Sequence, residues 1–488
     1  MSRWQSGAVN VLFITLDQFR GDCLSVAGHQ VVETPELDAL ARSGVRFAHH
    51  FSQAAPCGPG RASLYTGMYQ MNHRVVANGS PLEDRFDNVA RLAARAGCES
   101  VLFGYTDQTL DPTLADGPDD PRLATYEGVL SGFDPVLPLD GHFDAWVADL
   151  ADRGFGELTG VEALMSEDRR PAEYSASAFL TGRIISWLDD RPADAAPFFL
   201  HASYLRPHPP YVAAGHWAEK YRPEEMPAPV PVGEPAHPLH QLALGVPVAA
   251  APTDPEAMAR LMAQYYGNIS LVDHEVGRLR RALEDRGLLE QTVIVVTADH
   301  GEQLGDHGLV QKLGYFEESY FIPCLISHPI LVEGHGSVVD HFTESVDIMP
   351  TLAGILGEDQ PVQCDGHSLL PFLEGDAPGD WRDSVHYEWD WRDLLMGPGH
   401  VGGDPERGLD ECNLAVERTA TEAYVHFGDG SWLCFDLRAD PTWHTLTTDP
   451  SVVLPRAQSM LKWRANHLGG RWTQMVVGPE RKGLWPEL

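Results

Sequence analysis

The segment VNVLFITLD, residues 9–17, is a short apolar run that ends at an acidic residue. An apolar run of this length is typical of a strand buried on both faces of a sheet. Predicted helices and strands then alternate along the chain. Helices are expected at 34–44, 88–97, 173–191 and 255–286, and strands at 99–106, 197–204 and 292–301. This alternation predicts an α/β fold with a large, mostly parallel sheet that helices cover on both faces.

The pattern changes after residue 375, where strand-like runs become shorter and one contains a Gly-Asp-Gly turn typical of a hairpin. These runs lie at 384–391, 413–419 and 422–438. The sequence therefore predicts a main domain over residues 1–375 and a small C-terminal subdomain and tail over 376–488, with a short antiparallel sheet. The Pro-rich segment 223–255 predicts a long surface loop, which forms either a lid or wall of a site or an ordered insertion.

Composition limits the classes of partner. The chain has 488 residues, and its 70 acidic and 35 basic residues give a formal net charge of -35. Such a charge disfavours nucleic acid and anionic membranes, so an anionic substrate must meet a local group of positive side chains. The first apolar run is too short for a secretion signal or membrane span. Seven scattered cysteines form no CxxC pair, which favours a reducing cytoplasm.

Polar side chains follow several predicted strands. In a parallel sheet, ligand sites lie beyond the carboxyl ends of the strands, so these residues are expected to meet. Asp17 and Gln18 follow one strand, and Asp299 and His300 follow another. Together they offer oxygen ligands and one imidazole, a set that suits Ca²⁺, Mn²⁺ or Mg²⁺, with Zn²⁺ still possible. The alternative is that each Asp only caps the following helix.

Two further strand-end loops carry candidate residues. His208 lies in YLRPHPPYV, where prolines stiffen the backbone and fix the direction of the imidazole. Lys312, one of only four lysines, lies in a Gly-rich segment after Asp299 and His300 that can fold back over the site. For both residues the alternative is an ordinary surface position.

The segment QAAPCGPGRASLYTGMY, residues 53–69, places Cys57 at the start of a predicted helix. A helix N-terminus lowers the pKa of a thiol and attracts anions, so one interpretation is a thiolate nucleophile of the tyrosine-phosphatase kind. That chemistry needs five residues between the Cys and the Arg. Only three residues separate Cys57 from Arg61, so the spacing excludes it.

The other interpretation is a maturation site. CGPGRASLYTG, residues 57–67, resembles the C-x-P-x-R...L-x-T-G signature of the sulfatase family, in which the Cys is oxidised to formylglycine. The segments LDQFRGD, TADHGEQLGDHG and CDGHSLLPFL extend the resemblance along the chain. Sulfatases belong to the alkaline-phosphatase superfamily, so the resemblance implies an α/β/α sandwich and a catalytic domain over 1–375. MNHRVVANG, YLRPHPPYV, MPAPV and HYEWDWRDL resemble the phosphonate monoester hydrolase and phosphodiesterase branch.

The resemblance implies roles for particular residues. One divalent metal, Ca²⁺ or Mn²⁺ ahead of Mg²⁺ or Zn²⁺, would be bound by the formylglycine made from Cys57 together with Asp17, Gln18, Asp299 and His300. Arg61 would hold the formylglycine hydrate. Asn78, His208 and Lys312 would contact the transferred group or the leaving oxygen.

Three positions depart from the family pattern. Sulfatases carry Gly-Lys-Trp-His after the strand that here ends FGYTDQ, so Tyr105 and Asp107 replace a lysine and a histidine, and Tyr105 becomes a substrate-binding candidate. The phosphonate hydrolase branch has Tyr at the first position and Thr at the second. Gly60 stands where sulfatases usually have Ser and this branch has Ala.

Losing positive charge at Tyr105 and Asp107 disfavours dianionic phosphate monoesters by Coulomb repulsion. Sulfate monoesters, phosphonate monoesters and phosphodiesters remain. A metal lowers the pKa of one hydroxyl of hydrated formylglycine, which attacks sulfur or phosphorus to form a covalent ester. Loss of the second hydroxyl proton then releases the acid, and Asp107 is our hypothesis for that base. The alternative is a solvated loop carboxylate.

The leading function is therefore a promiscuous formylglycine hydrolase of phosphonate monoesters, phosphodiesters and sulfate monoesters. The alternatives are a dedicated arylsulfatase and a pseudoenzyme that keeps Cys57 unconverted and only binds an anion. A two-zinc phosphatase would need further His and Asp ligands that the sequence does not place. The implied partners are a small anionic ester and a formylglycine-generating enzyme. The family and a tail containing Trp463, Trp472 and Trp485 also suggest a homo-oligomer, either a dimer or a tetramer.

Overall fold

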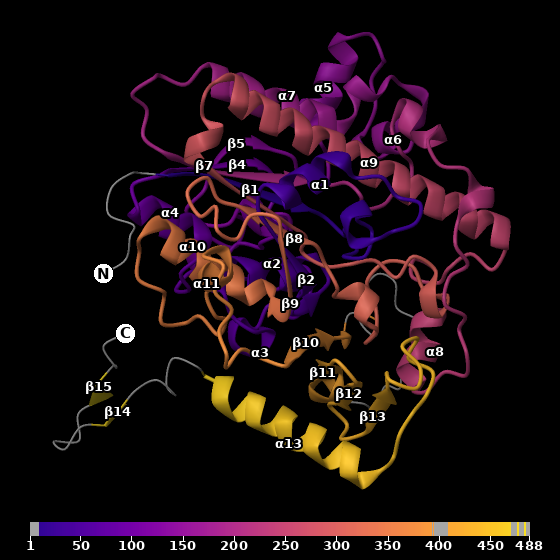
Figure 1. Ribbon diagram of the computed structural model, residues 1–488. Coiled ribbons are helices and arrows are strands. Elements are labelled where there is room, and N and C mark those ends of the chain that lie inside the picture. The colour runs from indigo at the N-terminus through magenta and orange to yellow at the C-terminus, as the bar shows by residue number, and fades with distance from the viewer. Residues whose placement is uncertain (1–8, 393, 395–407, 470–475, 478–482, 485–488) are drawn as a thin grey trace.

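The central element is an eight-stranded sheet with the strand order β5-β4-β6-β1-β7-β8-β2-β9 (Figure 1). The computed structural model describes residues 9–392, 394, 408–469, 476–477 and 483–484. The strands of this sheet are β1 (Asn10–Leu16), β2 (Val45–Phe51), β4 (Glu99–Gly104), β5 (Asp134–Pro138), β6 (Phe198–Tyr204), β7 (Thr292–Thr297), β8 (Cys324–Ser327) and β9 (Ser337–Glu344). Only β8 runs antiparallel to its neighbours, so the predicted mostly parallel sheet is confirmed.

Helices cover both faces of this sheet because its strands are apolar on both sides. In β1, Leu12, Ile14 and Leu16 pack into one buried cluster, and Val11 and Phe13 pack into another. The first cluster includes residues from α1 (Pro35–Arg42), α5 (Asp144–Asp152), α7 (Ala176–Asp189) and α9 (Pro255–Asp285). The second includes residues from α2 (Cys57–Thr66), α4 (Val89–Arg95), α10 (Ile348–Leu356) and α11 (Leu370–Leu373). The predicted three-layer α/β architecture is therefore confirmed.

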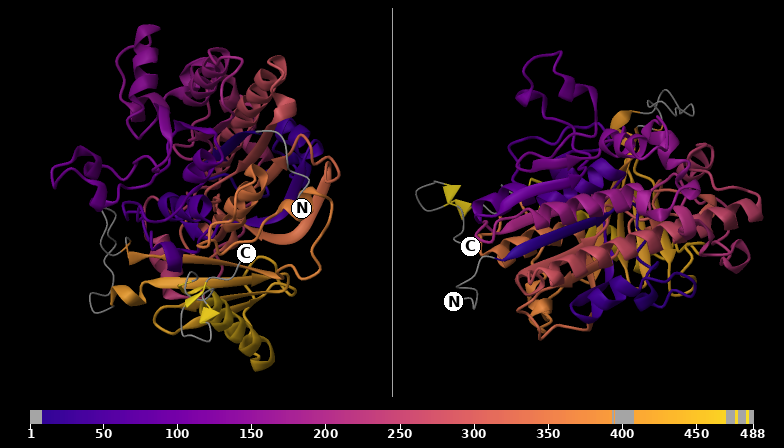
Figure 2. Two further views of the ribbon diagram at one scale, coloured as in Figure 1. Left: turned by 90° about the vertical axis from the view of Figure 1, so that its left-hand side faces the viewer. Right: turned by 90° about the horizontal axis from the view of Figure 1, so that it is seen from above.

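A smaller sheet lies beside the large one (Figures 1 and 2). Its strands, in the spatial order β13-β12-β11-β10-β3, are β13 (Trp432–Asp436), β12 (Glu422–Phe427), β11 (Asn413–Thr419), β10 (Ser384–Asp390) and β3 (Ala54–Ala55). The strands β10 to β13 pair antiparallel, as predicted. The two-residue strand β3 joins β10 in parallel, so the backbone just before Cys57 belongs to this sheet.

The helix α13 (Pro450–His467) packs against the small sheet (Figure 2). Its Trp463 is buried and stacks on His386 with ring centroids 4.5 Å apart. This tryptophan therefore serves the core of its own chain, while Trp472 and Trp485 lie outside the described residues. The homo-oligomer stays a prediction.

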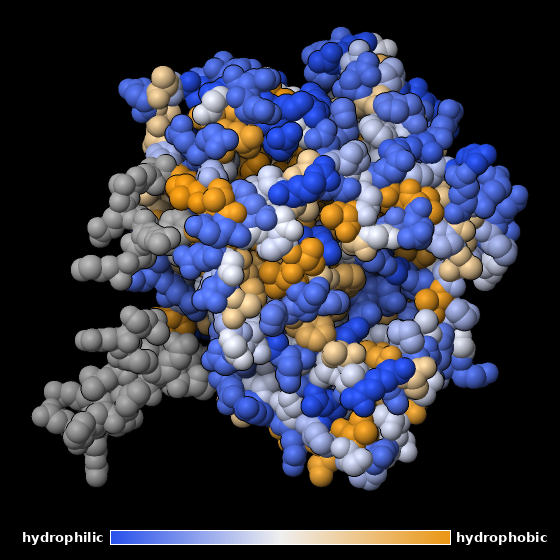
Figure 3. All heavy atoms as spheres, viewed as in Figure 1, coloured by the Kyte–Doolittle hydropathy of each residue, from blue (hydrophilic) through white to orange (hydrophobic). Residues whose placement is uncertain are grey.

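The remaining elements are short. They are α3 (Gln70–His73), α6 (Gly160–Leu164), α8 (Pro238–Leu244), β14 (Val476–Val477) and β15 (Gly483–Leu484). The expected long loop over 223–255 is corrected by α8, which begins with Pro238 and is capped by the His237 side chain. Among the described residues, no helix combines the length and apolar character needed to span a bilayer. Hydrophilic residues cover most of the face shown in Figure 3.

Candidate functional site

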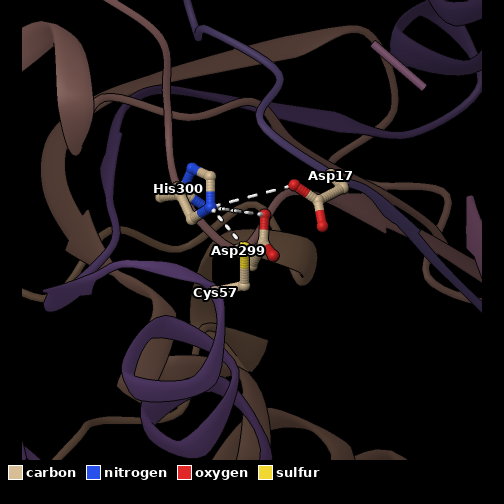
Figure 4. A group of neighbouring side chains, drawn as sticks. All are labelled: Asp17, Cys57, Asp299 and His300. Atoms are coloured by element: carbon tan, nitrogen blue, oxygen red, sulfur yellow. Dashed lines mark hydrogen bonds and ion pairs between the residues drawn. The ribbon is translucent and has the colours of Figure 1, made fainter. Parts of the chain in front are cut away.

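Four side chains with metal-ligating atoms meet at the carboxyl end of the large sheet (Figure 4). Asp17 follows β1, Asp299 and His300 follow β7, and Cys57 begins α2. One ligand atom from each lies within 4.8 Å of the others, and all four residues are buried. His300 Nε2 lies 3.2 Å from Cys57 Sγ and 3.8 Å from a carboxylate oxygen of each aspartate. The two predicted strand ends therefore do meet, and Cys57 completes the group.

The group has the properties of a metal site. Asp17 Oδ1 is buried without a hydrogen-bond partner, which is costly unless a cation compensates it. His300 Nδ1 lies 3.0 Å from the Gly301 carbonyl oxygen, which can only accept, so Nδ1 donates and Nε2 keeps a lone pair facing the cluster. Carboxylates with one imidazole suit a hard divalent cation. The residues present therefore fit the metal that the sequence predicts.

The surroundings of Cys57 disfavour a thiolate. Burial and the negative charge of Asp17 raise the pKa of the thiol well above its usual range. The expected effect of the helix N-terminus is thus overturned, because burial disfavours a thiolate more strongly. A protonated thiol facing metal-ligating groups fits a residue that acts after conversion to an oxygen ligand.

Gln18 and Lys312 extend the cluster. Gln18 Oε1 accepts a hydrogen bond from Lys312 Nζ at 2.8 Å, and its backbone N–H donates to Asp299 Oδ1 at 3.1 Å. Lys312 is buried, although its loop follows a strand end far along the chain. The loop does fold back over the site, as its glycines predict.

His208 also lies in the site. Its Nδ1 is 2.8 Å from the Pro209 carbonyl oxygen, so Nδ1 donates and Nε2 accepts from Lys312 Nζ at 3.0 Å. Burial, and then the charge of Lys312, lower the pKa of His208 to about 3. At neutral pH His208 is therefore an uncharged imidazole held by a cationic lysine.

Arg61 is buried beside the carboxylates of Asp17 and Asp299. Its Nε donates to Asp299 Oδ2 at 2.8 Å, and its Nη2 donates to Asp17 Oδ2 at 3.1 Å. Its Nη1 donates to Ser203 Oγ, the Tyr105 carbonyl oxygen and Tyr65 OH. The guanidinium thus orients the carboxylates, and its predicted contact with a formylglycine hydrate stays a prediction.

Tyr105 and Asp107 lie beside Arg61. Tyr105 OH donates to Asp17 Oδ2 at 2.6 Å, and its ring centroid lies 4.4 Å from Arg61 Cζ. Asp107 is only 7% exposed, and its Oδ2 lies 3.8 Å from Arg61 Nε. Burial raises the pKa of Asp107 to about 7, although Arg61 opposes this shift. Asp107 is therefore not the solvated loop carboxylate of the alternative interpretation.

Asn78 contacts the start of α2. Its Oδ1 accepts from the backbone N–H of Gly58 at 2.8 Å. The first N–H groups of a helix have no partner within the helix, so this bond fixes the turn that carries Cys57. Its predicted contact with substrate stays a prediction.

Sequence reasoning missed Glu302, and it left segment 223–255 open between a lid or wall of the site and an ordered insertion. Glu302 is fully buried and accepts a hydrogen bond from the side-chain amide of Gln18. Its position two residues after His300 is the sequence signal that could have identified it as part of the site. The segment 223–255 holds the Lys312 loop from outside. Val230 N–H donates to Asp306 Oδ1 at 2.6 Å, and Val230 O accepts from His307 N–H at 2.9 Å. The segment thus supports this loop.

Comparisons with known proteins follow this geometry. A sequence model described as Sulfatase matches residues 9–358. The chain is 36% identical to the multifunctional alkaline phosphatase superfamily protein PehA of Trinickia caryophylli, over 96% of this chain and 98% of that one. It is 29% identical to an arylsulfatase of Clostridium perfringens over 95% of each chain.

Solved structures give the same picture. A phosphonate monoester hydrolase of Agrobacterium radiobacter superposes with a TM-score of 0.89 at 38% identity, covering 98% of this chain and 100% of that one. The corresponding enzyme SpPMH of Silicibacter pomeroyi gives 0.86 at 33% identity, covering 98% and 99%. The similarity therefore extends over nearly the whole chain, including the small sheet.

Proposed function

This chain belongs to the sulfatase family, and from that premise we propose that it is a formylglycine- and metal-dependent hydrolase of phosphonate monoesters, phosphodiesters and sulfate monoesters. The observation that carries the proposal is the cluster of Cys57 with Asp17, Asp299 and His300. Relatives named as a multifunctional protein, a phosphonate monoester hydrolase and an arylsulfatase support this range of esters. The similarity to phosphonate monoester hydrolases and sulfatases over nearly the whole chain identifies it as an ester hydrolase.

Asp17, Gln18, Asp299, His300 and formylglycine 57 would hold one divalent metal, with Ca²⁺ or Mn²⁺ as the first candidates. Such a metal, when bound, stabilises negative charge on oxygen and lowers the pKa of a hydroxyl. Arg61 keeps two of these carboxylates in place through its hydrogen bonds with Asp17 and Asp299.

After conversion, residue 57 would supply, as its hydrate, one hydroxyl for attack on the ester and a second whose proton would be lost when the acid is released. Lys312 and His208 are the groups that would act on the oxygen of the departing alcohol. The nearby carboxylates of Asp17, Asp299 and Glu302 favour a charged Lys312, so we expect an ammonium ion that can bind an anionic ester oxygen. The Lys312 ammonium carries the proton that a leaving alkoxide would take, and neutral His208 orients that ammonium by accepting a hydrogen bond from it at Nε2.

Asp107 is the proposed base for the second hydroxyl. Asp107 lies close to Gly58, the residue that follows Cys57. A Cβ built on Gly58 would be 3.4 Å from the Asp107 carbonyl oxygen. The raised pKa of Asp107, about 7, suits a group that takes and returns a proton near neutral pH. Asn78 helps by fixing the backbone of Gly58, next to residue 57.

Charge supports esters with a single negative charge. The carboxylates of Asp17, Asp299 and Glu302 already oppose the cations Arg61 and Lys312 in a buried site. A divalent metal then leaves little excess positive charge in the site, and deprotonation of Asp107 would reduce that excess further. Dianionic phosphate monoesters would be bound less well than monoanionic esters.

The test begins with the peptide mass at Cys57, in protein made with and without a formylglycine-generating enzyme. Conversion of the thiol to the aldehyde predicts a defined mass loss, and retention of the thiol would favour the anion-binding pseudoenzyme. The converted protein is then assayed for kcat/KM on an aryl sulfate, an aryl phosphonate monoester, a phosphodiester and a phosphate monoester. Turnover of the sulfate alone would favour a dedicated sulfatase. Light scattering of the same sample tests the homo-oligomer.

A further inference from the structure

Glu302 is a buried carboxylate at which three loops of the site converge. Its side chain is fully buried, and its oxygens accept four hydrogen bonds. The donors are the Gln18 side-chain amide, Tyr211 OH at 2.8 Å, and the backbone N–H groups of Leu304 at 2.8 Å and Gln311 at 2.6 Å. Gln18 follows β1, Tyr211 lies in the loop of His208, and the other two donors lie in the loop of Lys312. One carboxylate thus connects the loops that carry three of the proposed site residues.

The first consequence concerns the amide of Gln18. A carboxylate can only accept, so the Gln18 nitrogen must face Glu302 and its oxygen must face the other way. On that side Lys312 Nζ, which can only donate, contacts Gln18 Oε1 at 2.8 Å. The two partners demand the same orientation. Without Glu302, the hydrogen bond from Lys312 alone would orient the Gln18 amide.

The second consequence concerns the loop before Lys312. Leu304 and Gln311 have positive φ angles of 51° and 67°, which L-residues rarely adopt. Glu302 Oε1 accepts from the backbone N–H of both residues and so holds the two ends of this loop together. Gln303 N–H also donates to the Gln311 carbonyl oxygen at 2.7 Å. The backbone that leads into Lys312 is therefore anchored on the same side chain that orients Gln18.

We propose that Glu302 is a positioning residue that keeps the Gln18 carbonyl oxygen directed at the metal site and anchors the Lys312 loop. The inference rests on the proposed function, because it takes Asp17, Gln18, Asp299 and His300 as metal ligands. Glu302 itself does not face the substrate, since all of its described contacts are with groups that support the site. Its effect is therefore expected first in metal affinity.

The experiment is calorimetric titration of Mn²⁺ into metal-depleted, formylglycine-converted protein. The unsubstituted chain is expected to bind one Mn²⁺, and E302Q is expected to bind it about 10- to 100-fold more weakly. Glutamine has nearly the same shape, but its amide can also donate, so it no longer requires the Gln18 nitrogen to face it and leaves Lys312 as the only group that orients Gln18. If Glu302 acts through Gln18, E302Q added to Q18A changes the affinity by no more than about twofold.

The matched control is D273N. Asp273 is another buried carboxylate that accepts backbone N–H groups, from Glu36 and Leu37, but it lies on α9 away from the cluster. D273N is expected to lower Tm and leave Mn²⁺ affinity unchanged. E302D provides a second variant if E302Q does not fold, because its shorter side chain withdraws the carboxylate from the Gln18 nitrogen and should also weaken binding.

Three results would overturn the assignment. They are an unchanged Mn²⁺ affinity in a folded Glu302 variant, additive losses from E302Q and Q18A, and an equal loss in D273N. If the unsubstituted chain binds neither Mn²⁺ nor Ca²⁺, the proposed function fails and this inference fails with it. A chain that binds Mn²⁺ normally while E302Q is unaffected would refute the role of Glu302 alone.

Discussion

Arg61 donates through Nε to a carboxylate oxygen of Asp299 over 2.8 Å, and both side chains are completely buried. The same guanidinium reaches Asp17 through Nη2 at 3.1 Å. Two carboxylates brought close together out of water repel one another unless a cation compensates them. Arg61 is therefore needed for the ligand set to form before any metal binds.

The substitution R61M tests this relationship. It keeps much of the side-chain volume but leaves Asp17 and Asp299 without their cation, so it should destabilise the metal-free protein by about 3–5 kcal/mol. Urea unfolding in the presence of a chelator measures the change. As a control, R281A removes an exposed partner of Glu36 and should cost less than about 1 kcal/mol. Equal stabilities of the two variants would contradict the prediction.

At Gly60, α2 lies close to the backbone of Asp299 and Ala54. A Cβ at this position would be 2.5 Å from the Asp299 carbonyl oxygen and 2.9 Å from that of Ala54. We predict that G60A costs about 1–3 kcal/mol, because the strain exceeds the gain in helix propensity. It should also weaken Mn²⁺ binding by displacing Asp299.

The matched control for Gly60 lies in α7. A Cβ on Gly182 would meet nothing within 4 Å, so G182A should stabilise the protein by about 0.5–1 kcal/mol. Thermal unfolding should show a lower Tm for G60A and a higher Tm for G182A if α2 is closely packed at Gly60. A stabilising G60A would show that α2 has room to move.

The strand-end residues could be predicted because two physical rules act in sequence. Apolar runs identify β1 and β7, and the carboxyl ends of neighbouring parallel strands meet at one edge of a sheet. Asp17, Asp299 and His300 follow directly from these rules. The place of Cys57 in the metal site could be predicted only from the sulfatase motif. The spacing between Cys57 and Arg61 excluded a tyrosine-phosphatase loop but did not establish another function.

Other parts of the site depend on tertiary contacts that leave no local signal. The strand β3 has only two residues, too few for any periodicity, yet it joins the small sheet. The sequence leaves Asp107 open between a catalytic base and a solvated loop carboxylate. Asp107 is buried next to a distant segment whose Gly128 carbonyl oxygen accepts from Thr106 Oγ1 at 2.8 Å and from Gln108 N–H at 3.3 Å. Burial of a short loop by another loop cannot be derived from the composition of either.

Asp107 predicts a pH dependence. A base works when deprotonated, and burial places the pKa of Asp107 at about 7. The value of kcat should therefore rise with pH through about 7 and fall by about tenfold per unit at lower pH. D107N should lower kcat by about 10²- to 10⁴-fold and abolish this limb. D140N, at an exposed position nearby in the chain, should keep the original profile. An unchanged acid limb in D107N would assign the titration to another group.

Metal removal should destabilise the protein. A ligand that binds only the folded state adds about 2.7 kcal/mol at 100 times its Kd. Chelation should therefore lower Tm, and added Mn²⁺ or Ca²⁺ should restore it in a concentration-dependent way. The gain should shrink at low pH, because the carboxylates and the imidazole must be deprotonated to bind.

The variant D299N separates metal binding from a general effect of divalent salt. It keeps a side chain of similar shape but loses the charge that attracts a cation, so its Tm should respond only weakly to Mn²⁺. D273N should respond like the unsubstituted protein, because Asp273 accepts from the first N–H groups of α1 and does not belong to the cluster. An equal rise of Tm in D299N would mean that Mn²⁺ binds elsewhere. No rise in the unsubstituted protein would mean that the unpartnered oxygen of Asp17 is compensated by something other than a metal.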